Sequence, residues 1–168
     1  NSTHTDVVFT GATGGPAPQA ATLHLHACVN EVIRSLGDRV LAAGVKVHLR
    51  ADPKLQIHSI RSDWASVFTN LIANSLKHGF KGLEGGEIHI QIEADAQRLH
   101  VHYRDTGRGM APEVLAKVFE PFFTTDLQRN MGLGMHLVYN LVTQRFGGSI
   151  WCESRPDEGA SFHIEVPR

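Results

Sequence analysis

One stretch of the sequence carries several polar and charged side chains at helical spacing. Asn70, Asn74, Lys77 and His78 follow one another at intervals that place them on one face of an α-helix. Asparagine is a mediocre helix former, so two of them on one stripe need a reason. An amide oxygen is a hard ligand suited to Mg²⁺, and a lysine ammonium suits phosphate. The stretch indicates a magnesium–phosphate site, with a solvated polar helix face as the alternative.

A second stretch, 105–110, reads DTGRGM and directly follows an expected strand. A carboxylate at a strand end, here Asp105, can accept a hydrogen bond from an exocyclic amine such as that of adenine. Gly107 and Gly109 allow the backbone to approach a ligand closely or to adopt a positive φ. A plain turn is the alternative interpretation.

A third stretch, 119–125, reads FEPFFTT and contains three of the eight phenylalanines of the chain, Phe119, Phe122 and Phe123. Aromatic residues usually pack in the core, but these lie beside an expected loop. They can therefore also seat a lid that covers a pocket.

Glycines mark the last two stretches. Gly132 and Gly134 open an expected helix, whose free N–H groups and dipole favour an anion, and Arg129 adds positive charge just upstream. A helix start with flexible glycines is the alternative. The final stretch, 159–162, reads GASF and is a turn into the last strand, which by itself indicates little.

Hydrophobic periodicity predicts the elements that must position these groups. Apolar residues at three- and four-residue spacing predict helices over 25–43, 62–78 and 133–146. The inward residues of the last helix are expected to be Leu137, Val138, Leu141 and Val142. Strands are expected over 45–49, 55–58, 87–93, 99–103, 150–154 and 162–166, with a short helix after Pro112. The order favours an α+β two-layer sandwich, with one mixed, mostly antiparallel sheet and helices on one face.

Composition limits the classes of protein to which the chain can belong. Residues 1–22 are rich in Gly, Ala, Thr and Pro without a period, so we expect a connector or arm before one domain at 23–168. A formal net charge of -1 gives no reason to expect a nucleic-acid partner. No apolar run approaches the roughly 20 residues of a membrane helix.

Cysteines and histidines do not form a recognisable metal motif. Cys28 and Cys152 have no CxxC spacing, so we expect two reduced thiols in a cytoplasmic protein. His100 and His102 alternate on an expected strand, as do His24 and His26 near a helix start. Such pairs can bind a metal, but solvent-facing histidines are the favoured interpretation.

The order and spacing of the five stretches resemble the N, G1, F, G2 and final glycine boxes of the histidine kinase catalytic domain. That superfamily also contains type II topoisomerase, heat-shock chaperone and mismatch-repair ATPases. The phrases FEPFFTT and GLGMHLVYNLVTQRFGGSI are especially similar to sensor kinases. The resemblance covers about 25–168 and implies the Bergerat-type ATP-binding fold, with ATP and Mg²⁺ as ligands.

The resemblance also implies roles for individual residues. Asn74 would coordinate Mg²⁺ with support from Asn70, Lys77 would contact phosphate, and His78 would flank the nucleotide. Asp105 would bind the adenine amino group beside Gly107 and Gly109. The remaining implied contacts are Phe119, Phe122, Phe123 and Thr124 at the lid, Arg129, Gly132, Leu133, Gly134 and Met135 beside the phosphates, and Ser161 in the final box.

The residue type at position 70 bears on which activity of this superfamily the chain has, and here it is asparagine. Members that hydrolyse ATP have at this position a glutamate that activates water, whereas an amide cannot take that proton at neutral pH. Transfer of the γ-phosphoryl group to an outside nucleophile is therefore favoured over hydrolysis, because positioning and charge stabilisation do most of that work.

The chain also departs from the complete family pattern. None of its eleven histidines has the context of a phospho-acceptor, so we expect the dimerisation helices with the acceptor to precede Asn1 and this segment alone to be monomeric. The implied function is a protein-histidine kinase of two-component signalling, with a response-regulator receiver domain as partner, in the cytoplasm or in the cytoplasmic part of a membrane-bound sensor. The last box reads GASF where GTxF is usual. Alternatives are an anti-sigma-type serine kinase and a degenerate regulatory module of the same fold.

Overall fold

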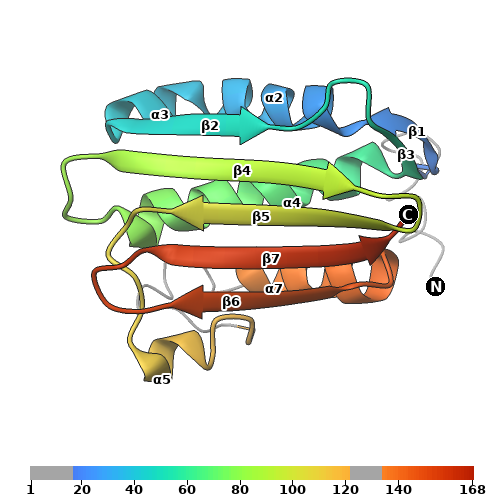
Figure 1. The fold of residues 1–168 in the computed structure, drawn as a ribbon. Helices are drawn as coiled ribbons and strands as arrows, with labels where there is room; N and C mark the ends of the chain where they lie inside the picture. Colours follow the sequence, from blue (N-terminus) through green and yellow to red (C-terminus); the bar gives the residue numbers. More distant parts are fainter. Residues whose placement is uncertain (1–16, 122–133) are drawn as a thin grey trace, which may run out of the picture.

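The structure, a computed structural model, describes residues 17–121 and 134–168. A five-stranded sheet in the order β2-β4-β5-β7-β6 forms one layer (Figure 1). β2 is parallel to β4, and the other neighbouring strands of this sheet are antiparallel. The five strands are β2 (Val45–Arg50), β4 (Gly86–Ala94), β5 (Arg98–Asp105), β6 (Ser149–Ser154) and β7 (Ala160–Pro167).

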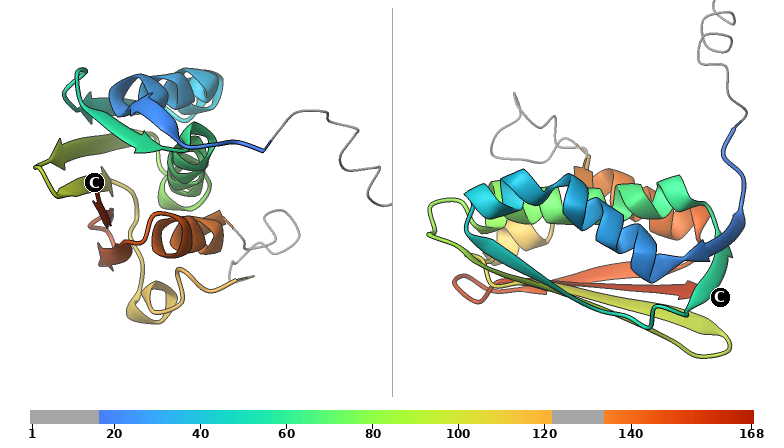
Figure 2. Two further views of the ribbon diagram at one scale, coloured as in Figure 1. Left: turned by 90° about the vertical axis from the view of Figure 1, so that its right-hand side faces the viewer. Right: turned by 90° about the horizontal axis from the view of Figure 1, so that it is seen from above.

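Helices form the second layer and lie on one face of the sheet, which leaves the other face open (Figure 2). The bounds of the helices are α2 (Leu25–Ser35), α3 (Gly37–Ala42), α4 (Arg61–Asn74), α5 (Pro112–Leu115) and α7 (Gly134–Asn140). α4 and α7 continue into π-helical turns, η2 (Ser75–Gly79) and η3 (Leu141–Arg145). The predicted two-layer α+β sandwich with a mixed, mostly antiparallel sheet is confirmed. Among the described residues, none of the helices has the length and apolarity that crossing a membrane requires.

The core lies between the two layers, because alternate residues of each central strand face the helices. On β5, Leu99, Val101 and Tyr103 are buried in this way. Trp64, Phe68 and neighbouring apolar residues of α4 cover them from the helical side. The same alternation places Asp105, the last residue of β5, on the buried face as well.

Three sequence-based expectations differ from the structure. The helix expected over 25–43 is divided at Leu36 into α2 and α3. The expected connector contains part of a strand, β1 (Ala21–His24), which pairs antiparallel with β3 (Gln56–Ser59). Leu137 was expected to face inward but is 43% exposed, because α7 begins at Gly134 and presents Met135 and Val138 to the core instead.

Candidate functional site

Asp105 is the centre of the candidate site and is almost fully buried, with 2% of its surface exposed. Its Oδ2 accepts a hydrogen bond of 2.6 Å from the Ser75 hydroxyl. Its Oδ1 accepts bonds from the backbone N–H groups of Gly107, at 3.0 Å, and Ala160, at 3.2 Å. A buried carboxylate needs such donors, and these three fix its orientation.

A buried hydroxyl network extends from Asp105 into the core. The Tyr103 hydroxyl lies 2.7 Å from Ser75 Oγ and 3.1 Å from the Leu71 carbonyl oxygen. Because the single Ser75 proton is donated to Asp105, the tyrosine proton must be donated to Ser75 Oγ or to Leu71. Burial raises the pKa of Tyr103 well above its ordinary value, so its hydroxyl remains a donor at neutral pH.

The turn after β5 packs directly against the π turn η2. Arg108 N–H donates to the Gly79 carbonyl oxygen at 2.8 Å. A Cβ atom on Gly107 would lie 2.4 Å from that same oxygen, so only glycine allows this approach. Thr106 is held by β4, because its N–H donates to the Glu87 carbonyl at 3.0 Å and its hydroxyl accepts from Glu87 N–H at 2.9 Å.

Two glycines lock this turn to the turn between β6 and β7. Gly109 and Gly159 both have positive φ, 69° and 72°. A Cβ on Gly109 would lie 1.9 Å from the Arg155 carbonyl oxygen, and one on Gly159 would lie 2.1 Å from that of Asp105. The Asp157 N–H also donates to the Arg108 carbonyl at 2.7 Å. The first and last glycine stretches of the motif set are therefore in contact.

The α4 stretch and the glycine-rich helix start are also brought together. A Cβ on Gly134, at the start of α7, would lie 3.1 Å from Asn70 Oδ1. The other end of this amide, Nδ2, donates to the Ser66 carbonyl at 2.7 Å, which fixes the oxygen toward Gly134. The glycine at the start of α7 and the amide oxygen of Asn70 thus lie side by side.

The helix around Asn74 is not the regular α-helix that the spacing predicted. Asn74 is the last residue of α4 and is half-buried, and Lys77 and His78 lie in η2. The Phe80 N–H donates to the Ser75 carbonyl at 2.8 Å, five residues back, so the turn is widened. The π turn changes the phase of Lys77 and His78 relative to Asn70, and π turns of this kind occur frequently at functional sites.

The other predicted site residues have different placements. Phe119 packs on Phe162, with ring centroids 6.2 Å apart, and on Tyr139, at 5.5 Å, so its ring belongs to the edge of the core. Met135 is also a core residue, 6% exposed. Six predicted residues lie outside the described part of the chain: Phe122, Phe123, Thr124, Arg129, Gly132 and Leu133.

Ser161, which the resemblance assigns to the ligand contacts, lies on the opposite face of the sheet from Asp105, and its contact with a ligand stays a prediction. On β7 the residues Ala160 and Phe162 face the helices, so Ser161 between them points to the open face of the sheet. Its cross-strand neighbour there is Arg104, which is exposed.

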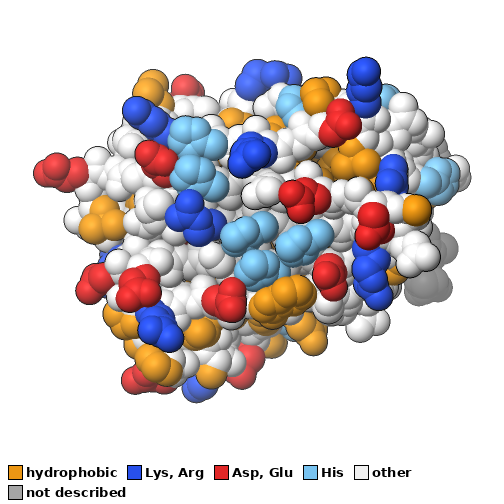
Figure 3. All heavy atoms as spheres, in the orientation of Figure 1, with side chains coloured by type: hydrophobic (Ala, Val, Ile, Leu, Met, Phe, Trp, Pro, Cys, Tyr) orange, Lys and Arg blue, Asp and Glu red, His pale blue; other side chains and the backbone are white. Residues whose placement is uncertain are grey.

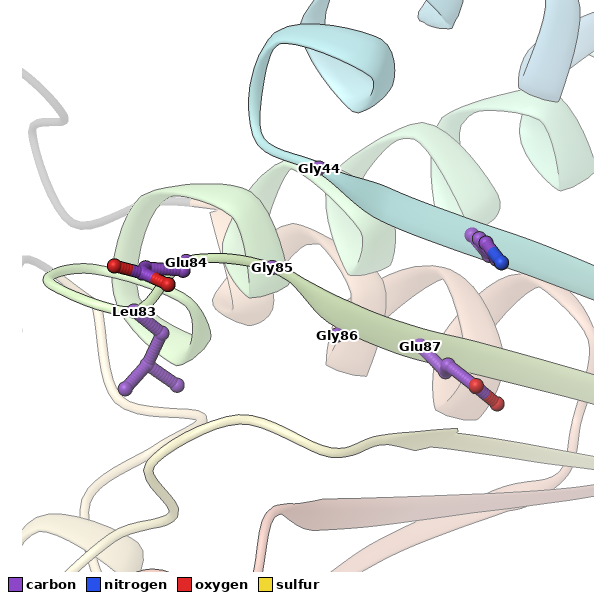
Figure 4. Close-up of a pocket in the computed structure, with 7 residues that line it drawn as sticks. Gly44, Leu83, Glu84, Gly85, Gly86 and Glu87 are labelled. Atoms are coloured by element: carbon purple, nitrogen blue, oxygen red, sulfur yellow. The ribbon is translucent and has the colours of Figure 1, made fainter.

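Two hollows on the described surface lie away from this cluster. One, of about 550 Å³, is lined by Gly44, Lys46 and residues 83–87 at the start of β4 (Figure 4). The other, of about 200 Å³, lies on the open face of the sheet between His48 and His102. Neither hollow includes Asp105 or Asn74. The predicted lid over 124–131 lies outside the described residues.

Comparison with known proteins decides the family. Residues 60–168 match the family model described as histidine kinase-, DNA gyrase B-, and HSP90-like ATPase. The chain belongs to this family. Sensor kinase CckA of Brucella abortus is 33% identical over 144 residues, which cover 74% of this chain and 15% of CckA. Sporulation kinase A of Bacillus subtilis is 29% identical over 147 residues, covering 87% of this chain and 23% of the kinase.

Solved structures of this ATPase family agree with the fold. The catalytic domain of histidine kinase ThkA superposes with a TM-score of 0.77 at 25% identity, covering 89% of this chain and 95% of that domain. The chain spans less than a quarter of the two curated relatives, so it corresponds to their ATPase domain. The resemblance inferred from the motifs is confirmed.

Sequence reasoning missed several residues that build the wall around Asp105. Ser75 donates to the carboxylate and Tyr103 is hydrogen-bonded to Ser75. Thr106 connects the turn to β4, and Gly79 provides a close backbone contact. One signal could have found Ser75: it is a polar residue within the apolar stripe of the helix. Tyr103 and Asp105 continue the alternation of Leu99 and Val101 on the buried face of β5, and this alternation could have identified Tyr103 as a neighbour of the site.

Proposed function

We propose that this domain binds Mg-ATP and supplies the γ-phosphoryl group to a histidine on a dimerisation domain outside this chain, as part of two-component signalling. The observation that carries the proposal is the buried Asp105 carboxylate, oriented by Ser75, Gly107 and Ala160 at the end of β5. Such a fixed acceptor suits one exocyclic amine, which is the group that distinguishes adenine from guanine at that ring position.

The residues around Asp105 have room for the adenine amino group. Oδ2 accepts one hydrogen bond, from Ser75, and a carboxylate oxygen has capacity for a second. A Cβ on Gly79 would lie 3.0 Å from Oδ2, so the glycine leaves open the space beside this oxygen that any other residue would fill. Asp105 would therefore select the base, and Gly79 would leave space for it.

The residues on α4 suit magnesium and phosphate. Asn74 offers an amide oxygen of the kind that Mg²⁺ accepts, and Lys77 in η2 offers a positive charge. Asn70, one turn before Asn74 on α4, has its Oδ1 beside Gly134 at the start of α7, where backbone N–H groups would favour an anion. Mg²⁺, when bound, would neutralise charge on the phosphates during transfer.

Asn70 favours transfer over hydrolysis. Its Nδ2 is committed to the Ser66 carbonyl, and its Oδ1 belongs to a neutral amide that cannot accept a proton from water. The domain would therefore position ATP without activating a water molecule, and the nucleophile would come from outside. This is consistent with the names of the relatives, which are sensor and sporulation kinases.

A response-regulator receiver domain is the expected downstream partner. A chain of the same fold, with a TM-score of 0.72 at 22% identity, belongs to the complex of histidine kinase ThkA with response regulator protein TrrA. An anti-sigma-type serine kinase and a degenerate regulatory module are the alternatives. The first would phosphorylate a serine of a protein partner, and the second would not bind nucleotide.

Calorimetric titration with a non-hydrolysable ATP analogue and Mg²⁺ tests the proposal. We expect saturable binding that Asp105→Asn weakens by roughly ten-fold or more, because a hydrogen bond to a charged group contributes about 1.5–3 kcal/mol. Asn74→Ala should weaken binding only when Mg²⁺ is present. Asp95→Asn, in the exposed turn after β4, is the matched control and should bind like the wild type.

A well-folded wild type that does not bind the analogue would overturn the proposal and favour the degenerate module. Transfer is tested separately, by incubating the domain with labelled ATP and a separately produced dimerisation domain that carries a phospho-acceptor histidine. Acid-labile label on a histidine supports the kinase assignment, whereas acid-stable label on serine would favour the anti-sigma-type activity.

A further inference from the structure

The open face of the sheet carries a group of histidines that the nucleotide site does not use. Figure 3 shows histidine side chains gathered in two groups on this face. The first group lies on the parallel pair β2 and β4, where His48 and His89 are direct cross-strand neighbours. Glu87 precedes His89 by two residues, so it points to the same face of the sheet.

The donor atoms of this trio are already close together. Glu87 Oε1 lies 3.0 Å from His89 Nε2 and 3.4 Å from His48 Nε2. All three ligand atoms lie within 4.8 Å of one another. Donor atoms around a tetrahedral Zn²⁺ ion with bonds of about 2.0–2.1 Å stand about 3.3 Å apart, which matches both carboxylate–imidazole distances.

One of the two imidazole rings must turn before all three side chains can bind the same ion. The imidazole rings of His48 and His89 are stacked, with centroids 4.7 Å apart and 14° between their planes. A metal ion lies near the plane of each imidazole that binds it, so one ring must turn. The side chains of His48, Glu87 and His89 are 47%, 47% and 37% exposed, which leaves them free to do so.

We propose that His48, Glu87 and His89 form a binding site for a divalent transition-metal ion, with Zn²⁺ as the best match. The two imidazoles are borderline nitrogen ligands that favour Zn²⁺, Co²⁺ or Ni²⁺ over Mg²⁺ and Ca²⁺, and a carboxylate oxygen is compatible with these ions as the third ligand. Three protein ligands leave a fourth position for water or for a group from another molecule. The ion would also connect the edge strand β2 to β4.

Nearby positive charges limit the affinity of this site. Lys46 is the cross-strand neighbour of Glu87, and Arg104 is that of His89. Arg50 lines the same 200 Å³ hollow as the two histidines. These cations oppose a bound cation, so we expect micromolar rather than nanomolar binding.

The second histidine group has a different arrangement and provides the matched control. His163 stacks on His102, at 4.4 Å between centroids, and on Trp151, at 5.0 Å. Its carboxylate partner, Glu153, lies 3.1 Å from His163 Nε2. In the described part of the chain, the only cluster with metal-ligand spacing is the trio of His48, Glu87 and His89.

Titration of the tag-free chain with Co²⁺, followed by visible absorption, tests the proposal, and Zn²⁺ competition gives the affinity. We expect one ion per chain and the intense bands of a tetrahedral site. His48→Gln and Glu87→Gln should each weaken binding by more than about ten-fold, as expected for the loss of one of three ligands. His163→Gln should change the affinity by less than about two-fold.

Thermal unfolding with and without Zn²⁺ gives a second readout, because an ion that binds only the folded state raises the Tm. The rise should occur in the wild type and in His163→Gln, and it should be absent in His48→Gln. No tetrahedral Co²⁺ bands, or an equal loss of affinity in His163→Gln and His48→Gln, would overturn the proposal.

Discussion

Ser75 donates a hydrogen bond of 2.6 Å to Asp105, and this bond connects the end of the α4 helical segment to the end of β5. Both residues are buried at the boundary between the helical layer and the sheet. The orientation of the Asp105 carboxylate therefore depends on the packing of the two layers, as well as on the turn that follows β5. A change at Ser75 should affect both stability and ligand binding.

Replacing Ser75 with alanine should destabilise the domain by about 1–3 kcal/mol, since Asp105 is buried and would lose one of its three donors. Urea unfolding measures this change. Ser35→Ala is the control, because that hydroxyl donates only to the Val32 carbonyl on an exposed helix end. Equal losses of unfolding free energy in the two variants would show that the bond to Asp105 contributes no more to stability than a hydrogen bond at an exposed helix end.

Asp105→Asn should change the choice of base as well as the affinity. The amide oxygen can still accept from Gly107 and Ala160, which leaves the NH₂ group at the position of Oδ2. A donor at that point opposes the amino group of adenine and suits the carbonyl of guanine. Competition between ATP and GTP analogues should therefore move toward GTP, whereas an unchanged ratio would mean that Asp105 does not contact the base.

Gly109→Ala should destabilise the domain by more than Gly147→Ala. Both glycines have positive φ, 69° and 68°, so both substitutions carry a backbone strain of about 1 kcal/mol. Only at Gly109 would the new methyl group meet another atom, the Arg155 carbonyl oxygen at 1.9 Å, since nothing lies within 4 Å at Gly147. The difference in free energy of unfolding between the two variants measures how tightly the two turns are locked.

Acidification should destabilise the domain through His102. Burial lowers the pKa of His102 below 6.5, and the neighbouring His163, His100 and Arg104 lower it further, partly offset by Glu153. The unfolded chain therefore takes up the proton first, so stability is lost as the pH falls below about 6.5. Urea unfolding at about pH 7.5 and about pH 5.5 should show a smaller pH effect in His102→Gln than in the wild type.

His58→Gln, an exposed histidine on β3, is the control for the pH experiment and should keep the pH dependence of the wild type. The Nε2 atom of His102 is buried and has no hydrogen-bond partner among the described residues, which is consistent with a neutral ring. A pH effect of the same size in His102→Gln and in the wild type would contradict the assignment.

Most of the fold could be predicted because apolar residues recur at regular spacing along its strands and helices. The strands expected over 87–93 and 99–103 correspond to β4 and β5, whereas the contact between the 105–110 turn and the 159–162 stretch is visible only in the structure. β1 could not be found in this way, because it has four residues and only Leu23 is buried. Its existence depends on pairing with β3, more than thirty positions along the chain.

The details of the site depended on features that spacing does not encode. A period of 3.6 residues places Asn70, Asn74 and Lys77 on one face, but the π turn after Asn74 changes that relationship. The trio on the open face was missed because His48 and His89 come from different strands that become neighbours only in the parallel pair. Sequence proximity identified His100 and His102 instead.

The contact between the turns that contain Gly109 and Gly159 determines where a peptide can be inserted without unfolding the domain. A peptide inserted at Asp157 would separate its N–H from the Arg108 carbonyl and move Arg155 away from Gly109. The exposed turn at Pro53, between β2 and β3, is held by hydrogen bonds within the turn, from the N–H groups of Lys54 and Leu55 to Asp52. Reporters or fused domains should therefore be tolerated at Pro53 and should unfold the protein at Asp157, which comparison of the two insertions by circular dichroism would show.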